Sequence, residues 1–347
     1  MPRPLRPILA AAAACLLSAS ACGPGDAEAV RLGVAVPAAT TGGRSVQRGV
    51  TLAVEEFNAA GGLEGRKVEL EVRDDGGESD RAIAIAAELR DDPRVAAVIG
   101  HVNSTTTLAA AAIYNDPDNG VLEISPTASS PRLSEAGPWT FRVSPTDLAY
   151  GPAIARWLTG RGVKRAAVLY LNDEYGRPLA ESFATAFQEG GGTVLARDPF
   201  LPETLEDDEA LRVYLARAMR RGMEALVIGG TAEDARRIVP AARRAGHRGI
   251  IIGADGLLGM EEFGASVDGT YVGAAFFADA RSEEAARFVR LYRERWGELP
   301  NADGALAYDA ARVVLRALAQ GGTGRKQVRD YVAGIGTATP AFEGATA

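Results

Sequence analysis

Residues 30–73 read VRLGVAVPAATTGGRSVQRGVTLAVEEFNAAGGLEGRKVELEVR, and the rest of the chain repeats the pattern found here. The apolar run from Arg31 to Val36 predicts a buried strand. An amphipathic helix is predicted from Ser45 to Ala60, because apolar residues recur at helical spacing and Gly61-Gly62 ends the pattern. Lys67 to Arg73 predicts the next strand. This order indicates a βαβ unit with parallel strands and a right-handed crossover.

The same alternation continues to the end of the chain. The later strands are predicted as short apolar runs at 95–100, 121–125, 165–171, 192–198, 224–229, 249–253 and 270–275. The later helices are predicted at 78–92, 104–114, 147–160, 176–189, 207–221, 232–245, 282–296, 302–319 and 325–333. The pattern restarts after Phe141-Arg142-Val143. The predicted fold class is therefore α/β, with two Rossmann-like lobes, each a parallel sheet flanked by helices, joined by crossover hinge strands.

Residues 1–21 have the features of an export signal. Arg3 and Arg6 make the start positive, and Ile8 to Ala21 is apolar but too short to span a bilayer as a helix. Small residues precede Cys22, which resembles a bacterial lipobox, where the cysteine is acylated and becomes the new N-terminus. An ordinary secretory signal with a nearby cleavage site is the alternative. Either signal takes the mature protein out of the cytoplasm.

The composition argues against several classes of function. The chain has 347 residues and a net charge of −7, with acidic and basic residues intermixed and no basic stripe, so nucleic acid is not an expected partner. Once the signal is removed, Cys22 would be the only cysteine, so no disulfide is expected. One acylated cysteine and two histidines cannot build the usual zinc sites. No Gly-x-Ser-x-Gly elbow or phosphate-binding loop occurs. We therefore predict no enzyme, no cofactor and no metal.

An ordered set of stretches carries a family resemblance: Gly49 to Gly62, Gly65 to Leu70, Ile99 to Ser104, Ile124 to Ser129, Tyr175-Gly176, Gly229-Gly230 and Gly253 to Gly256. In this order they resemble the periplasmic substrate-binding proteins of the branched-chain amino-acid (leucine/isoleucine/valine) ABC transporter type, which have the type I periplasmic-binding-protein fold. The resemblance covers roughly residues 30–345.

The resemblance implies how the two lobes divide the chain. After the signal peptide at 1–21 and a linker at 22–29, it implies lobe 1 at 30–142 plus 274–335 and lobe 2 at 143–273 plus 336–347. The last residues look like the start of the family's closing segment, so we expect a truncated C-terminus.

Such folds bind ligands beyond the carboxyl ends of their strands. The resemblance implies six ligand-binding residues near that edge: Ser104, Thr127, Ser129, Tyr175, Thr231 and Asp255. It implies that Ser104 binds a ligand carboxylate and that Asp255 faces an ammonium group. Thr127 and Ser129 would meet both groups. Four of these positions have a structural alternative: Ser104 and Thr231 as helix caps, Asp255 as a turn or capping residue, and Tyr175 as a packing residue.

The resemblance implies an extracytoplasmic solute-binding lipoprotein, lying at the outer face of the cytoplasmic membrane or in the periplasm. It would capture an amino acid or a similar small carboxylate for an ABC transporter by clamshell closure. Its expected partners are an ABC permease and the membrane, through the lipid anchor, and we expect a monomer. Thr231 stands where the amino-acid binders of the family carry a tyrosine, which implies a less aromatic side-chain end. The alternative function is a ligand-sensing lipoprotein of the same fold that signals to a membrane partner.

Overall fold

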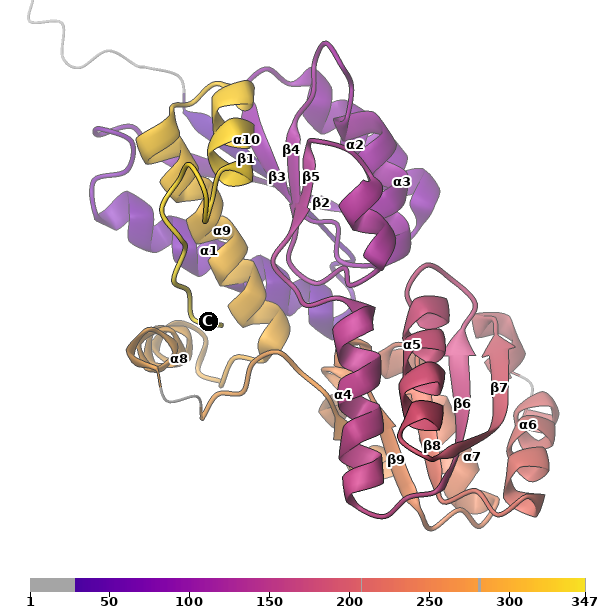
Figure 1. The fold of residues 1–347 in the computed structure, drawn as a ribbon. Coiled ribbons are helices and arrows are strands. Elements are labelled where there is room, and N and C mark those ends of the chain that lie inside the picture. The colour runs from indigo at the N-terminus through magenta and orange to yellow at the C-terminus, as the bar shows by residue number, and fades with distance from the viewer. Residues whose placement is uncertain (1–28, 207, 280–281, 347) are drawn as a thin grey trace, which may run out of the picture.

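The computed structural model describes residues 29–206, 208–279 and 282–346, which form two α/β lobes (Figure 1). The first lobe contains a five-stranded parallel sheet in the order β2-β1-β3-β4-β5. Its strands are β1 (Val30–Val36), β2 (Val68–Asp74), β3 (Val95–Ile99), β4 (Leu122–Ser125) and β5 (Thr140–Arg142). Its helices are α1 (Thr41–Ala59), α2 (Ser79–Asp91), α3 (Ser104–Tyr114), the short 3₁₀ helix η1 (Pro131–Glu135), α8 (Glu283–Trp296), α9 (Ala302–Gly321) and α10 (Arg325–Ala333).

The second lobe has a five-stranded parallel sheet in the order β10-β9-β8-β6-β7. Its strands are β6 (Arg165–Leu171), β7 (Thr193–Phe200), β8 (Ala225–Gly229), β9 (Ile250–Gly253) and β10 (Thr270–Val272). Its helices are α4 (Asp147–Gly160), α5 (Gly176–Glu189), α6 (Asp208–Arg220), α7 (Ala232–Arg244) and the 3₁₀ segments η2 (Pro202–Glu206), η3 (Asp255–Leu257) and η4 (Met260–Val267). The chain passes between the lobes after β5 and again after β10 (Figure 1). The predicted fold class is confirmed.

Both faces of each sheet are covered, as parallel strands require. Leu32 and Val34 of β1 pack in a core with α1, α8, α9 and α10. Ala35, which points to the opposite face because side chains alternate along a strand, packs with α2 and α3. In the second lobe, α6 and α7 share one core and α4 and α5 share the other. Among the described residues, no helix is long and apolar enough to cross a membrane.

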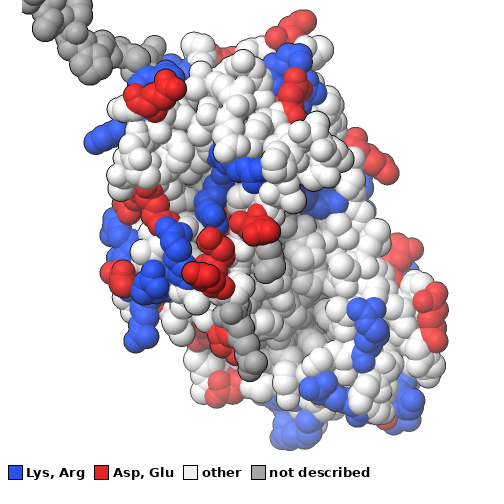
Figure 2. Space-filling view, turned by 60° about the vertical axis from the view of Figure 1, so that its left-hand side comes forward, with Lys and Arg blue, Asp and Glu red and all other residues white. Residues whose placement is uncertain are grey.

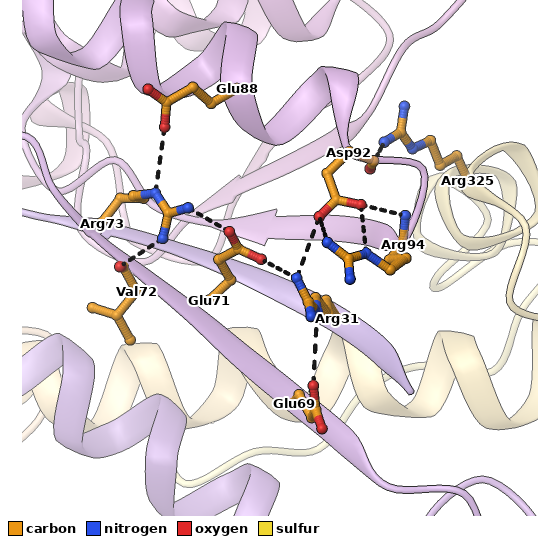
Figure 3. Close-up of polar contacts among 9 residues, drawn as sticks. All are labelled: Arg31, Glu69, Glu71, Val72, Arg73, Glu88, Asp92, Arg94 and Arg325. Carbon is orange, nitrogen blue, oxygen red and sulfur yellow. Dashed lines mark hydrogen bonds and ion pairs between the residues drawn. The ribbon is translucent and has the colours of Figure 1, made fainter. Parts of the chain in front are cut away.

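Ion pairs hold together the start of β1 and the loop before β3, on the side of the first lobe away from the carboxyl ends of its strands (Figure 3). Arg31 bonds Glu71 at 3.0 Å and Asp92 at 3.4 Å. Arg94 hydrogen-bonds Asp92 and lowers the pKa of that carboxyl to about 2. Arg325 of α10 donates to the carbonyl of Asp92 at 2.6 Å. These contacts fix the amino ends of the strands and leave the carboxyl ends for other contacts.

Helix α1 begins four residues earlier than the sequence predicted. Thr40 is its N-cap and accepts a hydrogen bond from the Gly43 N–H at 3.0 Å. Gly43 lies so close to Pro37 that a Cβ at position 43 would lie 2.1 Å from its carbonyl oxygen. Close packing of the backbone therefore requires a glycine at position 43, in the first turn of the helix.

The C-terminal segment packs on the first lobe. Asp309, in the middle of α9, accepts hydrogen bonds from the backbone N–H groups of Ala345 (2.8 Å) and Thr346 (2.9 Å). Arg316 of the same helix donates to the carbonyl oxygens of Pro340 and Ala341. This packing differs from the prediction that residues 336–347 belong to the second lobe. A buried helical carboxylate that binds this segment is the reason, and spacing alone does not reveal it.

Helices α1 and α9 cross at two glycines. A Cβ at position 49 would lie 2.1 Å from the carbonyl oxygen of Gly304, so the helix backbones are in direct contact there. We expect Gly49→Ala to push the helices apart and to lower the free energy of unfolding by about 1–3 kcal/mol. Urea unfolding followed by circular dichroism measures this change.

Gly160→Ala is the matched control, because position 160 also lies in a helix and has nothing within 4 Å of where a Cβ would be. We expect it to leave stability unchanged or to raise it slightly. Equal losses in the two variants would contradict the proposed contact.

Candidate functional site

A cavity of about 180 Å³ lies between the lobes. Its lining comes from the segments that follow β1, β3, β4, β6, β8 and β9, together with the start of α9. All six residues that the sequence singled out line it: Ser104, Thr127, Ser129, Tyr175, Thr231 and Asp255. A single buried water needs roughly 10–15 Å³ of such space, so the cavity has room for a small molecule. The structure brings the six residues together; their contacts with a ligand stay a prediction.

Hydroxyl and backbone groups line the side of the cavity that belongs to the first lobe. Ser104 is the first residue of α3, and its Oγ accepts a hydrogen bond from the Ser130 N–H at 3.1 Å. Thr127 donates its hydroxyl to the carbonyl of Val102 at 2.7 Å. The Ser129 hydroxyl is buried and forms no hydrogen bond of normal geometry with the described residues. The first N–H groups of α3 also lack partners within the helix, so this side offers neutral donors.

The opposite side, from the second lobe, carries a buried carboxylate. Asp255 is only 8% exposed and accepts a hydrogen bond from the Tyr175 hydroxyl at 3.2 Å. The Tyr175 oxygen in turn accepts from the Gly256 N–H at 3.1 Å. Burial raises the pKa of Asp255 from its ordinary value of 3.8 to about 7. Because the two groups are bonded, Tyr175 orients Asp255 and also lines the cavity.

Thr231 combines the two roles that the sequence left open. It lines the cavity and is also the N-cap of α7, forming a capping box with Asp234. Its hydroxyl donates to the Asp234 carboxylate at 2.9 Å. The hydroxyl proton is therefore already engaged, and a ligand would have to replace that bond to receive it.

Asp303 also lines the cavity, and the sequence reading did not single it out. It is the second residue of α9, is 7% exposed, and has no hydrogen-bond or ion-pair partner among the described residues. Burial raises the pKa of Asp303 to about 8, and Asp255 and Glu261 add to the rise. An aspartate in the first turn of a helix is ordinarily explained by the helix dipole, so the sequence contained no distinguishing signal.

Asp147 lies behind the cavity, at the first residue of α4, where the chain has just entered the second lobe. It is fully buried, and neither carboxylate oxygen forms a hydrogen bond of normal geometry with the described residues. Burial raises the pKa of Asp147 to about 8, opposed in part by the nearby Ser129 hydroxyl. Asp255 and Asp173 raise it further. The site therefore has more buried acid than the sequence reading indicated.

A buried contact between His101 and Asp75 supports the loop that presents Ser104. His101 Nδ1 lies 2.6 Å from Asp75 Oδ2, and both side chains are fully buried. Asp75 also accepts from the Gly77 N–H at 2.9 Å. The carbonyl of His101 accepts from the Ser125 hydroxyl at 2.6 Å. His101 does not line the cavity, so its role in the described structure is to position the loop.

Polar contacts also join the lobes around the cavity. Thr105 donates to Asp173 at 3.1 Å, and Arg132 pairs with Glu174 at 2.7 Å. Arg44 pairs with Glu262 at 3.0 Å. On the face shown in Figure 2, acidic and basic side chains are interspersed over both lobes. Among the described residues, no group of three or more histidine, cysteine, aspartate or glutamate side chains is placed to hold a metal ion.

Two similar parallel-sheet lobes, with a small polar cavity between the carboxyl ends of their strands, define a two-lobed binding protein for a small ligand. The sequence model of the periplasmic binding protein family matches residues 30–346, and the chain belongs to that family. The predicted family is thereby confirmed, as is the expectation that the chain is a binding protein and not an enzyme. Membership implies an exported, periplasmic protein.

The chain is similar to Leu/Ile/Val-binding protein homolog 1 of Brucella abortus, with 27% identity over 310 residues that cover 86% of this chain and 80% of that protein. Two solved structures share the fold with a TM-score of 0.82 and 28% identity. One is the branched-chain amino acid transporter substrate-binding protein LivJ of Streptococcus pneumoniae in complex with isoleucine, covering 92% of this chain and 90% of that one. The other is the leucine-binding protein LivK of Thermotoga maritima, covering 91% and 89%.

The raised pKa of Asp147 predicts how stability depends on pH. The folded state keeps a proton that the unfolded state releases between pH 4 and pH 8, so ionisation opposes folding as the pH rises. Asp147→Asn removes this titration. We expect the stability of the variant, relative to the unchanged protein, to increase from pH 5 to pH 8, by up to about 1.4 kcal/mol per pH unit. Urea unfolding without ligand at each pH measures the difference.

Asp116→Asn is the control for this experiment. Hydrogen bonds from the N–H groups of Asn119 and Asp118 lower the pKa of Asp116, so it stays ionised in both states over this range. Its effect should be the same at pH 5 and pH 8. A pH-independent effect of Asp147→Asn would show that Asp147 is already ionised in the folded protein.

Proposed function

We propose that this protein is an exported, lipid-anchored receptor that closes its two lobes around an amino acid and delivers it to an ABC permease. The observation that carries the proposal is the pairing of opposite chemistries across one cavity. Asp255 of the second lobe supplies a buried negative charge for an ammonium group. Ser104 and Ser129 of the first lobe supply neutral donors for a carboxylate. An α-amino acid carries both of these groups on one carbon atom.

Neutral donors suit the carboxylate end because they bind an anion without introducing a full positive charge. The N-terminus of α3 adds backbone N–H groups and the positive end of the helix dipole. An ammonium ion at the other end would stabilise ionised Asp255, whose charge is disfavoured by burial in the empty cavity. The names of the relatives, which are Leu/Ile/Val-binding and leucine-binding proteins, support the same class of ligand.

Closure would follow from ligand contacts with both lobes. Such a ligand favours the closed arrangement by the difference in its affinity for the two states. Contacts already present between the lobes, such as Thr105 with Asp173 and Arg44 with Glu262, would support the closed form. They are few and polar, which is consistent with lobes that can separate again to release the ligand.

Asp255→Asn tests the ammonium contact with little change of shape. A thermal-shift screen of the L-amino acids first identifies a ligand, because a molecule that binds only the folded protein raises the melting temperature. Leaving a buried charge unpaired costs about 3–5 kcal/mol. At about 1.4 kcal/mol per decade, Asp255→Asn should weaken the identified amino acid by on the order of a hundredfold or more in calorimetry.

The analogue that lacks the amino group provides the double-mutant control. It should bind the unchanged protein weakly and lose little more with Asp255→Asn, because both changes remove the same contact. Ser104→Ala should weaken the amino acid and the analogue alike, because they share the carboxylate. Unchanged binding of the amino acid by Asp255→Asn would refute the amino-acid assignment.

The lipid anchor is proposed at Cys22, which lies outside the described residues. Its support is the sequence: Arg3 and Arg6, a short apolar stretch, and small residues before the cysteine. Expressed with its signal in a bacterium that processes lipoproteins, the protein should partition into the detergent phase, and Cys22→Ala should move it to the aqueous phase. Mass spectrometry of a mature N-terminus at another residue would contradict this proposal.

A further inference from the structure

The charge of the cavity is strongly one-sided. Four carboxylic acids line it, and no lysine, arginine or histidine of the described residues does so. The four are Asp173, Glu233, Asp255 and Asp303. An α-amino acid with a neutral side chain has a net charge of zero and brings only one cationic group. What matters is therefore how many of the four acids already have a partner within the protein.

Two of the four acids have such partners. Asp173 accepts hydrogen bonds from the backbone N–H groups of Tyr175 (3.0 Å) and Gly176 (2.8 Å) at the start of α5, and from the Thr105 hydroxyl. Glu233 forms an ion pair with Arg236 at 3.4 Å. These contacts account for both acids without a ligand. Asp255 and Asp303 remain as acids without a cationic partner among the described residues.

Asp303 differs from Asp255 in having no hydrogen-bond donor at all among the described residues. It is more than nine-tenths buried, yet it lines the cavity, so its carboxylate is presented to whatever occupies that space. Gly42, which also lines the cavity, lies close to this carboxylate: a Cβ at position 42 would lie 3.1 Å from Asp303 Oδ2. A buried carboxylate without a partner is costly, and native proteins ordinarily pair or neutralise such a group.

Asp303 and Asp255 belong to different lobes. Each would be negative when ionised, and Asp255 contributes to the raised pKa of Asp303. Closing the two lobes over an empty cavity, or over an apolar ligand, therefore either brings two like charges closer together or keeps the acids protonated. A ligand with one ammonium group can satisfy Asp255 and still leave Asp303 beside its side chain.

We propose that the ligand is an amino acid with a cationic side chain, and that Asp303 binds the side-chain cation while Asp255 binds the α-ammonium group. This inference rests on the proposed function and names the substrate class within it. The second cation neutralises the remaining acid, and it links the first lobe to the second through the ligand. Asp303 thus acts as the residue that selects for a basic side chain.

The test compares L-lysine and L-arginine with L-norleucine, which has the lysine side chain without its terminal amine. Calorimetry with the full chain should show that lysine or arginine binds at least about tenfold more tightly than norleucine. Breaking a buried charge pair by removing one partner costs enough that Asp303→Asn should weaken the better basic ligand by about a hundredfold. The same variant should leave norleucine within about threefold, because norleucine has no cation for Asp303 to bind.

Glu261→Gln is the matched control. Glu261 is exposed, lies near enough to Asp303 to affect its pKa, and does not line the cavity. The Glu261→Gln substitution removes the same unit of charge without removing a contact with the ligand. It should therefore weaken binding of the basic ligand far less than Asp303→Asn does. A comparable effect of Glu261→Gln would mean that general attraction, and not a contact with Asp303, sets the preference.

The outcomes separate this inference from the proposed function. If norleucine or leucine binds more tightly than both basic amino acids, or if Asp303→Asn weakens norleucine as much as lysine, the inference is wrong and the amino-acid receptor stands. If no amino acid of either kind binds while circular dichroism shows a folded chain, the proposed function fails and takes the inference with it.

Discussion

Every strand in each sheet runs parallel to its neighbours, and the position of the site depends on this constraint. Because parallel strands run in the same direction, their carboxyl ends all lie at one edge of the sheet, and a crossover connection returns the chain to the opposite edge before the next strand. The loops after β3 and β4 therefore lie side by side in the first lobe, and those after β6, β8 and β9 lie side by side in the second. The helices that follow turn their free N–H groups toward the same edge. Two such edges face each other, and the cavity between them is lined by backbone donors and short polar side chains.

The electrostatics of the cavity follow from what the fold has removed from water. Asp255, Asp303 and Asp147 are all nearly or fully buried, and burial is the largest cause of the raised pKa of each. Within the part of the chain that the structure describes, none of the three has a lysine or arginine as a hydrogen-bond partner. The second lobe offers Asp255 neutral donors, among them the Tyr175 hydroxyl and the Gly256 N–H. Because each carboxyl is buried, its ionised form is disfavoured unless a group that stabilises the charge lies near it.

Rigid support for the cavity comes from groups that do not line it. The buried pair of His101 and Asp75 fixes the loop after β3, and Ser125 bonds the same loop through the His101 carbonyl. Direct backbone contact at Gly49 and Gly304 sets the distance between α1 and α9, and the start of α9 carries Asp303. A side chain so near a tightly packed helix crossing has little freedom to move away from a ligand. The position of the Asp303 carboxylate therefore depends on how α1 and α9 pack in the first lobe.

The sequence by itself determined most of the order of strands and helices, because apolar periodicity and glycine turns are local signals. The short strand β5 (Thr140–Arg142) was not among the predicted strands. Helices α4 and α5 begin and end where the pattern predicted, and the six residues expected at the carboxyl edge all line the cavity. Local signals failed where the deciding contact is distant in sequence. Residues 345–346 pack on the first lobe because their N–H groups donate to Asp309. Helix α1 begins earlier than predicted, where Gly43 packs against the carbonyl of Pro37. Asp303 and Asp147 looked like ordinary first-turn aspartates. Only the tertiary structure shows that both are buried, Asp303 in the cavity lining and Asp147 outside it, since desolvation depends on what surrounds a residue in space and not on its neighbours in the chain.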